Sequence, residues 1–181
     1  MRLIRNLYLT NRFFLAFTGL IAFTVTSFFW PFLFPVAQAL LVLFAAAFIM
    51  EVVVLFWQKN MVRAARQVPE LFSLNDPNPV KLSLKSHFVL PLHITVIDEQ
   101  PVQFQNRDFR IELTLKPQAR ETIVYELTPK TRGEYNFGRI NLFLHSTIGL
   151  VERRVKVPAE TMVPVYPSVL QSVQNGLKYA R

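Results

Sequence analysis

The residues of this sequence best suited to metal binding or acid–base catalysis are its three histidines, His87, His93 and His145. None of them has another His, Asp or Glu two or four positions away, the spacing by which one strand or helix presents two metal ligands. The chain has no cysteine, which excludes disulfides and thiolate metal sites. Nucleophile-elbow, P-loop and dinucleotide-binding patterns do not occur, and only five glycines are present for a phosphate-binding loop. We therefore predict no catalytic, cofactor-binding or metal site.

The remaining charged candidates have two interpretations each. Arg107-Asp108 and Arg153-Arg154 could recognise an acidic partner, but charged side chains are also usual at solvated strand edges, and we favour that interpretation. Glu51 lies in a long apolar run and could be an intramembrane polar contact or a proton site. Since Glu51 is close to the end of that run, we expect it instead to snorkel to the interface or to pair with a base such as Lys59.

An uncharged stretch of 38 residues, from Phe13 to Met50, dominates the amino-terminal third of the chain. A membrane-spanning helix needs about 20 mostly apolar residues, so the stretch is too long for one span and long enough for two. Pro31 and Pro35 interrupt it, because proline breaks helical hydrogen bonding. Residues 13–57 are therefore predicted to form a transmembrane α-helical hairpin, with spans near Phe13–Phe29 and Val36–Trp57.

The positive charge of the chain is concentrated around this hairpin. The net charge is +8, but residues 70–167 hold 12 Lys or Arg against 11 Asp or Glu, which argues against nucleic-acid binding. The positive-inside rule then places both ends and the soluble region in the cytoplasm and the turn outside, with residues 1–12 as a basic arm. A cleaved signal peptide is the alternative, but its apolar region would exceed the usual length of about 7–15 residues. The flanking bases are Arg2, Arg5 and Arg12 before the spans, and Lys59, Arg63 and Arg66 after them.

The period of the apolar residues changes after the hairpin. Residues 58–68 are predicted to extend the second helix until Pro69 ends it. Residues 69–168 then alternate between apolar and polar side chains, with turn signals between the runs, which predicts an all-β, immunoglobulin-like antiparallel sandwich. Residues 169–181 have no clear face and are interpreted as a linker-like tail. The predicted strands lie within 81–85, 92–96, 109–115, 123–127, 140–144, 155–157 and 162–166.

Three short motifs occur in order within the predicted sandwich. Glycines permit tight turns in the first two, and Tyr135 is expected to pack into the sandwich while its hydroxyl binds the backbone. Gly149 is expected to allow a bend before the next strand. The motif residues are Arg132, Gly133, Tyr135 and Gly138; Gly149, Leu150 and Arg153; and Tyr166 and Pro167.

This order of motifs resembles the family called domain of unknown function 58, whose members are bacterial membrane proteins. The resemblance covers essentially the whole chain and implies two membrane spans followed by a β-rich domain. Thr147 departs from it, because the family usually has proline there. Members normally continue beyond the Val-Tyr-Pro motif into a further module, commonly followed by a von Willebrand A-like region. This chain stops 14 residues after Pro167, so the resemblance implies the amino-terminal portion of such a protein.

The function expected from these observations is a non-enzymatic inner-membrane anchor and protein-interaction module. The resemblance implies assembly with a MoxR-type AAA+ ATPase and von Willebrand A-type proteins, and the hairpin could also pair with a second copy. One alternative is a periplasm-facing sensing or adhesion domain, which requires the inverted topology. Another is an amino-terminal fragment of a larger protein whose activity lies in a missing carboxyl-terminal module.

Overall fold

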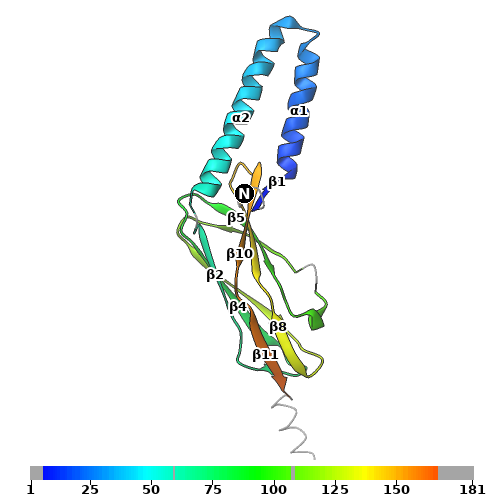
Figure 1. The fold of residues 1–181 in the computed structure, drawn as a ribbon, viewed down its shortest axis with the longest axis vertical. Coiled ribbons are helices and arrows are strands. Elements are labelled where there is room, and N and C mark those ends of the chain that lie inside the picture. The colour runs from blue at the N-terminus through cyan, green and yellow to red at the C-terminus, as the bar shows by residue number, and fades with distance from the viewer. Residues whose placement is uncertain (1–5, 59, 107–108, 167–181) are drawn as a thin grey trace, which may run out of the picture.

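Two helices project from one end of a β-sandwich (Figure 1). The structure is a computed structural model, and it describes residues 6–58, 60–106 and 109–166. The helical elements are α1 (Asn11–Ser27), the short 3-10 helix η2 (Pro31–Leu33), α2 (Phe34–Trp57) and a second 3-10 turn, η3 (Val102–Phe104). The strands are β1 (Leu7–Leu9), β2 (Val62–Gln67), β3 (Phe72–Ser73), β4 (Asn78–Ser86), β5 (Leu92–Asp98), β6 (Ile111–Leu115), β7 (Arg120–Leu127), β8 (Gly133–Phe137), β9 (Ile140–His145), β10 (Val151–Val157) and β11 (Thr161–Tyr166).

The helices α1 and α2 are both built from apolar residues and contact each other through aromatic rings. Phe13 of α1 lies 5.5 Å from Phe44 and 5.3 Å from Phe48 of α2, measured between ring centroids. Pro35 stands in the first turn of α2, where its missing N–H costs no hydrogen bond. Among the described residues, one helical stretch, Pro31–Trp57, is long and apolar enough to cross a membrane, judged by length and composition.

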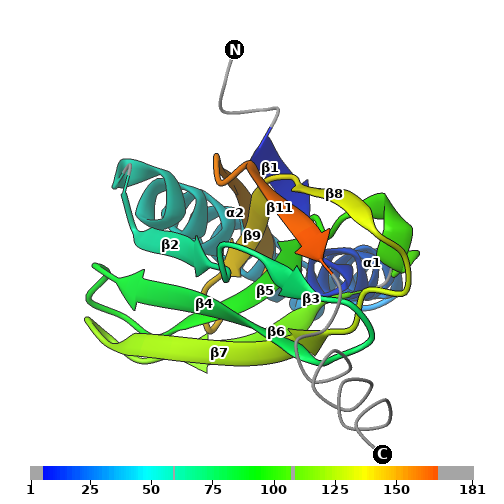
Figure 2. The same cartoon turned by 90° about the horizontal axis from the view of Figure 1, so that it is seen from below.

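The sandwich has two layers (Figure 2). One layer is the sheet β2-β4-β7. The other contains the five-stranded sheet β1-β10-β9-β5-β6 and the three-stranded sheet β3-β11-β8. Since β9 directly follows β8, and β11 directly follows β10, these two sheets continue each other along the domain. Inward-facing apolar residues of β4, such as Leu82 and Leu84, meet Ile94 and Val96 of β5 in the main core.

A buried ion pair crosses the sandwich between its layers. The side chains of Arg66 on β2 and Asp98 on β5 are 1% and 0% exposed, and Arg66 Nε donates to Asp98 Oδ2 at 3.2 Å. Arg66 also donates to the carbonyls of Gly138 at 3.1 Å and Ala159 at 2.9 Å, where the second layer divides into its two sheets. The Tyr125 hydroxyl donates to Asp98. Burial, and then the charge of Asp98, raises the pKa of Tyr125, so its hydroxyl keeps its proton.

The prediction of a helix extension over residues 58–68 is wrong. Helix α2 ends at Trp57, Gln58 is already extended, and Val62–Gln67 forms β2, which pairs antiparallel with β4. Alanine and arginine favour helices intrinsically, but the pairing with β4 and the inward position of Arg66 override that preference. After the helices, the strands of the sandwich therefore begin at Val62 and not at residue 69.

The amino-terminal arm also differs from the prediction. Leu7–Leu9 forms β1 and pairs antiparallel with β10, so this part of the arm is an edge strand of the five-stranded sheet. The predicted all-β sandwich is confirmed, and the described strand pairs are antiparallel except for β3 with β11, which is parallel. The segment Gly133–Phe137, which is not among the predicted strands, is strand β8. The predicted tail 169–181 lies outside the described residues.

Candidate functional site at the helix–sandwich junction

The turn between β9 and β10 lies between the sandwich ends of α1 and α2 (Figure 1) and contacts both helices. From α2, Glu51 points its carboxylate into this turn and is 2% exposed. Its Oε1 accepts from the backbone N–H of Gly149 at 3.0 Å and from the Ser146 hydroxyl, and its Oε2 accepts from the N–H of Leu150 at 2.9 Å. Three donors thus surround one carboxylate, the arrangement that stabilises a buried negative charge.

The prediction that Glu51 snorkels to the membrane interface is wrong. Its side chain is buried against the turn and does not extend along the helix toward solvent. Hydrogen bonds from the turn satisfy the carboxylate directly, so no snorkelling is needed to solvate it. The predicted alternative partner, Lys59, lies outside the described residues.

The first helix holds the same turn from the other side. Thr10 caps α1, because its Oγ1 accepts from the N–H of Phe13 at 3.4 Å. The Thr10 hydroxyl also donates to the carbonyl of Gly149, and the Thr10 N–H donates to the carbonyl of Leu150 at 3.2 Å. Gly149 has φ +70°, and a Cβ there would lie 3.1 Å from Arg12 Nη1. The bend predicted at Gly149 is therefore confirmed, and it presents backbone groups to both helices.

Arg153 on β10 attaches the sandwich to the carboxyl end of α2. Its Nη1 donates to the carbonyls of Leu55 at 2.5 Å and Gln58 at 2.7 Å, and its guanidinium lies 5.1 Å from the Phe56 ring centroid. A cation at this end complements the partial negative charge of the helix dipole and satisfies carbonyls left without helical partners. Burial lowers the pKa of Arg153, but an arginine starts so high that it stays charged near neutral pH.

Three of the nine motif residues therefore meet at the junction, namely Gly149, Leu150 and Arg153. The others lie elsewhere. Arg132 and Gly133 are exposed where β8 begins, and Tyr166 is 58% exposed at the end of β11. Gly138 donates its N–H to the Glu99 carbonyl at 2.9 Å, between β8 and β9, and Pro167 lies outside the described residues.

Tyr135 packs in a second apolar cluster below the main core. Its side chain is 1% exposed, and its ring lies 5.0 Å from that of Phe104. Its hydroxyl donates to the Thr131 carbonyl at 3.0 Å. The predicted combination of a buried ring and a backbone-bound hydroxyl is confirmed, so this motif residue stabilises the β7–β8 connection.

Two histidines come together on the outer face of the five-stranded sheet. The rings of His93 and His145 stack with centroids 5.0 Å apart, and His93 Nδ1 lies 2.8 Å from the Thr114 hydroxyl. Burial, followed by the charges of His145 and Arg12, lowers the pKa of His93. In the part of the chain that the structure describes, no group of three or more His, Asp or Glu side chains could hold a metal ion.

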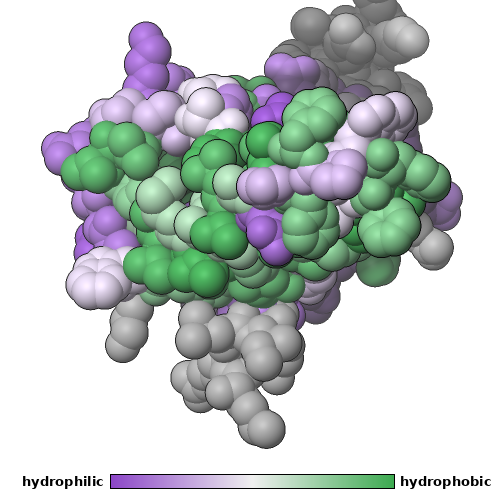
Figure 3. Space-filling model, turned by 90° about the horizontal axis from the view of Figure 1, so that it is seen from above, coloured by the Kyte–Doolittle hydropathy of each residue, from purple (hydrophilic) through white to green (hydrophobic). Residues whose placement is uncertain are grey.

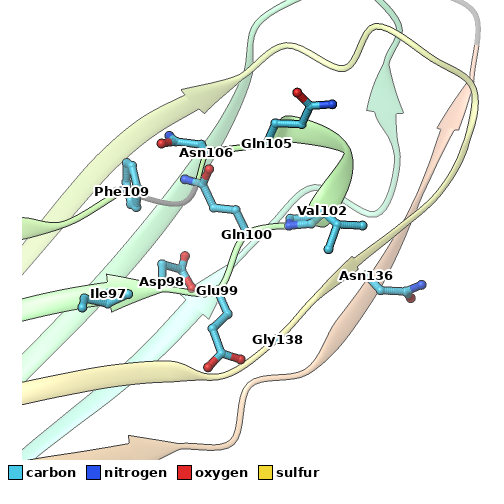
Figure 4. A pocket seen from close by; sticks show the side chains of 11 residues that line it. Ile97, Asp98, Glu99, Gln100, Val102, Gln105, Asn106, Phe109, Asn136 and Gly138 are labelled. Atoms are coloured by element: carbon cyan, nitrogen blue, oxygen red, sulfur yellow. The ribbon is translucent and has the colours of Figure 1, made fainter.

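An open pocket of about 890 Å³ lies beside η3 (Figure 4). Both carboxylates on its wall are engaged with the protein itself. Asp98 binds Arg66, while Glu99 accepts from the N–H of Arg139 at 2.9 Å and from the Asn141 amide at 2.7 Å. Burial would raise the pKa of Glu99, but the hydrogen bonds from Arg139 and Asn141 outweigh it and lower that pKa. These acids therefore serve to hold the walls of the pocket in place.

Comparison with known proteins adds little to this geometry. No family model and no curated protein matches the chain. Among solved structures, the PapD-like domain 7 of human CEP192 aligns at a TM-score of 0.44 and 12% identity, covering 60% of this chain and 87% of that one. The CARDB domain of the PF1109 protein from Pyrococcus furiosus aligns at 0.38 and 16% identity, covering 58% and 87%. A β-glucosidase from Listeria innocua aligns at 0.34 and 13% identity, covering 60% and 16%. Similarities of this size say nothing about function.

The junction has a mechanical capability more than a chemical one. Glu51 fixes α2 to the turn, Thr10 fixes α1 to it, and Arg153 caps α2, so the sandwich is held in one orientation relative to the helices. Sequence reasoning noticed Glu51 but missed its partners. The sequence offered one signal for this contact: Glu51 is a lone acid in an apolar run, and a turn containing Gly149 follows far along the chain.

Proposed function

We propose that this protein is a non-enzymatic membrane anchor and interaction module related to the domain-of-unknown-function-58 family. In this proposal α1 and α2 form a two-span hairpin in the bacterial inner membrane, and the sandwich lies on its cytoplasmic side. The observation that carries the proposal is the contact of Glu51 with the β9–β10 turn, which joins an otherwise exposed apolar helix firmly to a folded domain.

The exposed surface of the helices supports the membrane location. Only 11% of the most apolar stretch of α2 is buried against the rest of the protein. Leu15 of α1 and Val42 and Leu43 of α2 are 76%, 66% and 64% exposed. A soluble protein rarely exposes contiguous apolar patches larger than several hundred Å², so a bilayer is the environment that suits these helices. Seen from above, hydrophobic residues cover much of this face, with hydrophilic residues among them and along parts of its edge (Figure 3).

The hydrogen bonds of the junction also bear on topology. Strand β1 precedes α1 and pairs with β10 of the sandwich, while β2 follows α2 and pairs with β4. Both outer ends of the helix pair therefore belong to the same domain, as two spans require and a single span forbids. The basic residues flanking the helices favour the cytoplasm for that domain. Retention of both helices by the sandwich argues against removal of the first as a signal peptide.

Single cysteines can test insertion and orientation, because the chain has none of its own. We expect Phe32→Cys, in the turn between the helices, to react with a membrane-impermeant maleimide added outside intact spheroplasts. Thr131→Cys, at the far end of the sandwich, should react only after lysis, and both variants should resist alkaline carbonate extraction. The reverse labelling pattern would support the periplasmic sensing alternative, and extraction by carbonate would overturn the anchor.

The interaction role needs a separate test. Holding a sandwich at a fixed angle to the bilayer raises its effective concentration toward other membrane-bound proteins, so weak contacts suffice. The partners we propose are a MoxR-type AAA+ ATPase, von Willebrand A-type proteins and a second copy of the chain. We expect a tagged chain, solubilised in mild detergent, to enrich such an ATPase over an untagged control. Recovery of no protein partner, together with hydrolysis of a substrate that a point mutation abolishes, would contradict the proposal.

A further inference from the structure

The geometry points to a second membrane contact, in which a basic ladder and an apolar loop of the sandwich bind anionic lipid headgroups beside the end of α2. We infer this contact from Arg63, Lys85 and Arg120 and from the loop at residues 87–91. It rests on the proposed membrane anchor, because it assigns a role to the face of the sandwich nearest the bilayer.

The basic ladder lies across three strands of one sheet. Arg63 of β2 is paired with Lys85 of β4, which is paired in turn with Arg120 of β7. Directly paired residues present their side chains on the same face of a sheet, and all three are exposed, so they form one outward row. None of the three forms an ion pair with any residue the structure describes. Like charges directly opposite one another destabilise a sheet, so this row calls for a negative partner.

The position of the row identifies that partner. The middle strand of the ladder, β4, ends beside the end of α2. His87, just after β4, donates its N–H to the Met61 carbonyl at 2.7 Å, and Gln58 donates to the His87 carbonyl at 3.3 Å. In the next outward row of the same sheet, no residue is charged, and its members are Ala65, Ser83 and Thr122. The charge is therefore concentrated at the helix end of the sheet, where phospholipid headgroups would lie. A basic segment close to a membrane attracts anionic lipids, and each Lys or Arg raises the affinity by about fivefold.

An apolar loop stands next to the ladder. Between β4 and β5, Val89 is 69% exposed and Leu90 is 49% exposed, whereas the preceding Phe88 is buried at 5%. The β6–β7 turn supports this loop, since Gln118 donates its N–H to the Phe88 carbonyl at 3.3 Å. Exposed apolar residues flanked by cations suit the boundary between headgroups and acyl chains. The ladder would bind the headgroups while Val89 and Leu90 enter the layer beneath them.

Trp57 is a natural reporter of this contact, because it is the last residue of α2 and is 85% exposed. Trp30→Phe removes the other of the two tryptophans. The full chain would be reconstituted in bilayers mixing phosphatidylcholine and phosphatidylglycerol, in which only one of the two lipids carries brominated chains that quench tryptophan. From the quenching of Trp57 in the two mixtures, we expect the site beside this residue to prefer phosphatidylglycerol over phosphatidylcholine by roughly fivefold or more.

Two triple variants, each removing three positive charges, test the cause. The first triple variant should bring the preference for phosphatidylglycerol over phosphatidylcholine, expressed as a ratio, close to one. It combines Arg63→Gln, Lys85→Gln and Arg120→Gln. The matched control changes exposed cations farther from the helices, and it should keep the preference of the parent chain. Its substitutions are Lys81→Gln, Lys130→Gln and Arg132→Gln.

A second readout follows the loop itself. Val89→Cys carrying an environment-sensitive fluorophore should emit at shorter wavelength than the same label on Thr131→Cys. Equal emission from the two labels, or equal quenching by the two lipids in the parent chain, would overturn the headgroup contact while leaving the anchor intact. Quenching by neither lipid would instead overturn the anchor. If the ladder instead binds an acidic protein, the two brominated lipids should quench Trp57 equally. Stronger quenching by brominated phosphatidylglycerol contradicts that alternative.

Discussion

Replacing Glu51 with leucine is expected to weaken the attachment of α2 to the sandwich by about 3–5 kcal/mol. Leucine has a similar volume but no acceptor, so the N–H groups of Gly149 and Leu150 would lose their partner while remaining buried. The Ser146 hydroxyl would lose its acceptor as well. Hydrogen exchange of a peptide covering residues 146–150, measured in detergent, should accelerate by roughly a hundredfold or more.

Two further variants of α2 separate this effect from a general loss of polarity. Glu51→Gln keeps one carbonyl oxygen but turns an NH₂ group toward a backbone donor, so we expect an intermediate loss of about 1–2 kcal/mol. Gln38→Leu removes an exposed polar side chain from the same helix and should leave the exchange of residues 146–150 unchanged. Equal exchange in Glu51→Leu and in the parent chain would show that the turn does not depend on the carboxylate.

The second large effect is expected at the centre of the sandwich. Asp98→Leu leaves the guanidinium of Arg66 buried at 1% exposure without its counter-ion, which we expect to cost about 3–5 kcal/mol of unfolding free energy. The hydroxyl of Tyr125 loses its acceptor in the same variant. Denaturant unfolding followed by circular dichroism in detergent should show the transition of the β signal at a markedly lower midpoint.

The chain supplies its own control for this comparison. Arg139 and Glu160 form an ion pair of 2.9 Å whose side chains are 55% and 53% exposed. Glu160→Leu should therefore leave the unfolding midpoint almost unchanged, because water solvates the remaining guanidinium. The double variant Arg66→Leu with Asp98→Leu should recover much of the loss, since no lone charge is left buried. Similar losses from Asp98→Leu and Glu160→Leu would show that burial does not govern the Asp98 effect.

Most of the sandwich was predictable because its strands follow the rule of alternation. In β5, for example, Leu92, Ile94 and Val96 face the core and are 0%, 1% and 0% exposed. Strand β2 escaped prediction because its residues favour helices and an inward position is occupied by Arg66, whose partner Asp98 is 32 residues away. Strand β1 escaped because three residues give no measurable period.

The junction was harder to predict than the fold. Glu51 binds donors 95 to 99 residues farther along the chain, and no pattern of local spacing can reveal such a contact. The prediction that Glu51 snorkels relied on its distance from the end of the apolar run. That distance says nothing about whether a turn of the sandwich packs against the helix. Arg153 was recognised as a motif residue, but only the structure shows that it binds the carbonyls of Leu55 and Gln58.

Strand β1 also sets an order of events during synthesis. Its residues leave the ribosome first, yet Leu7 pairs with Arg153, which is made 146 residues later. Chains fold as they emerge from the amino terminus, so the apolar helices are available to the insertion machinery long before β10 exists. In the proposed two-span topology, the five-stranded sheet can form only after α2 has brought the chain back to the side of the membrane where β1 lies. In that topology, a complete domain requires both helices to have crossed the membrane, and failure of the second crossing would leave β1 and β10 on opposite sides without each other as partners.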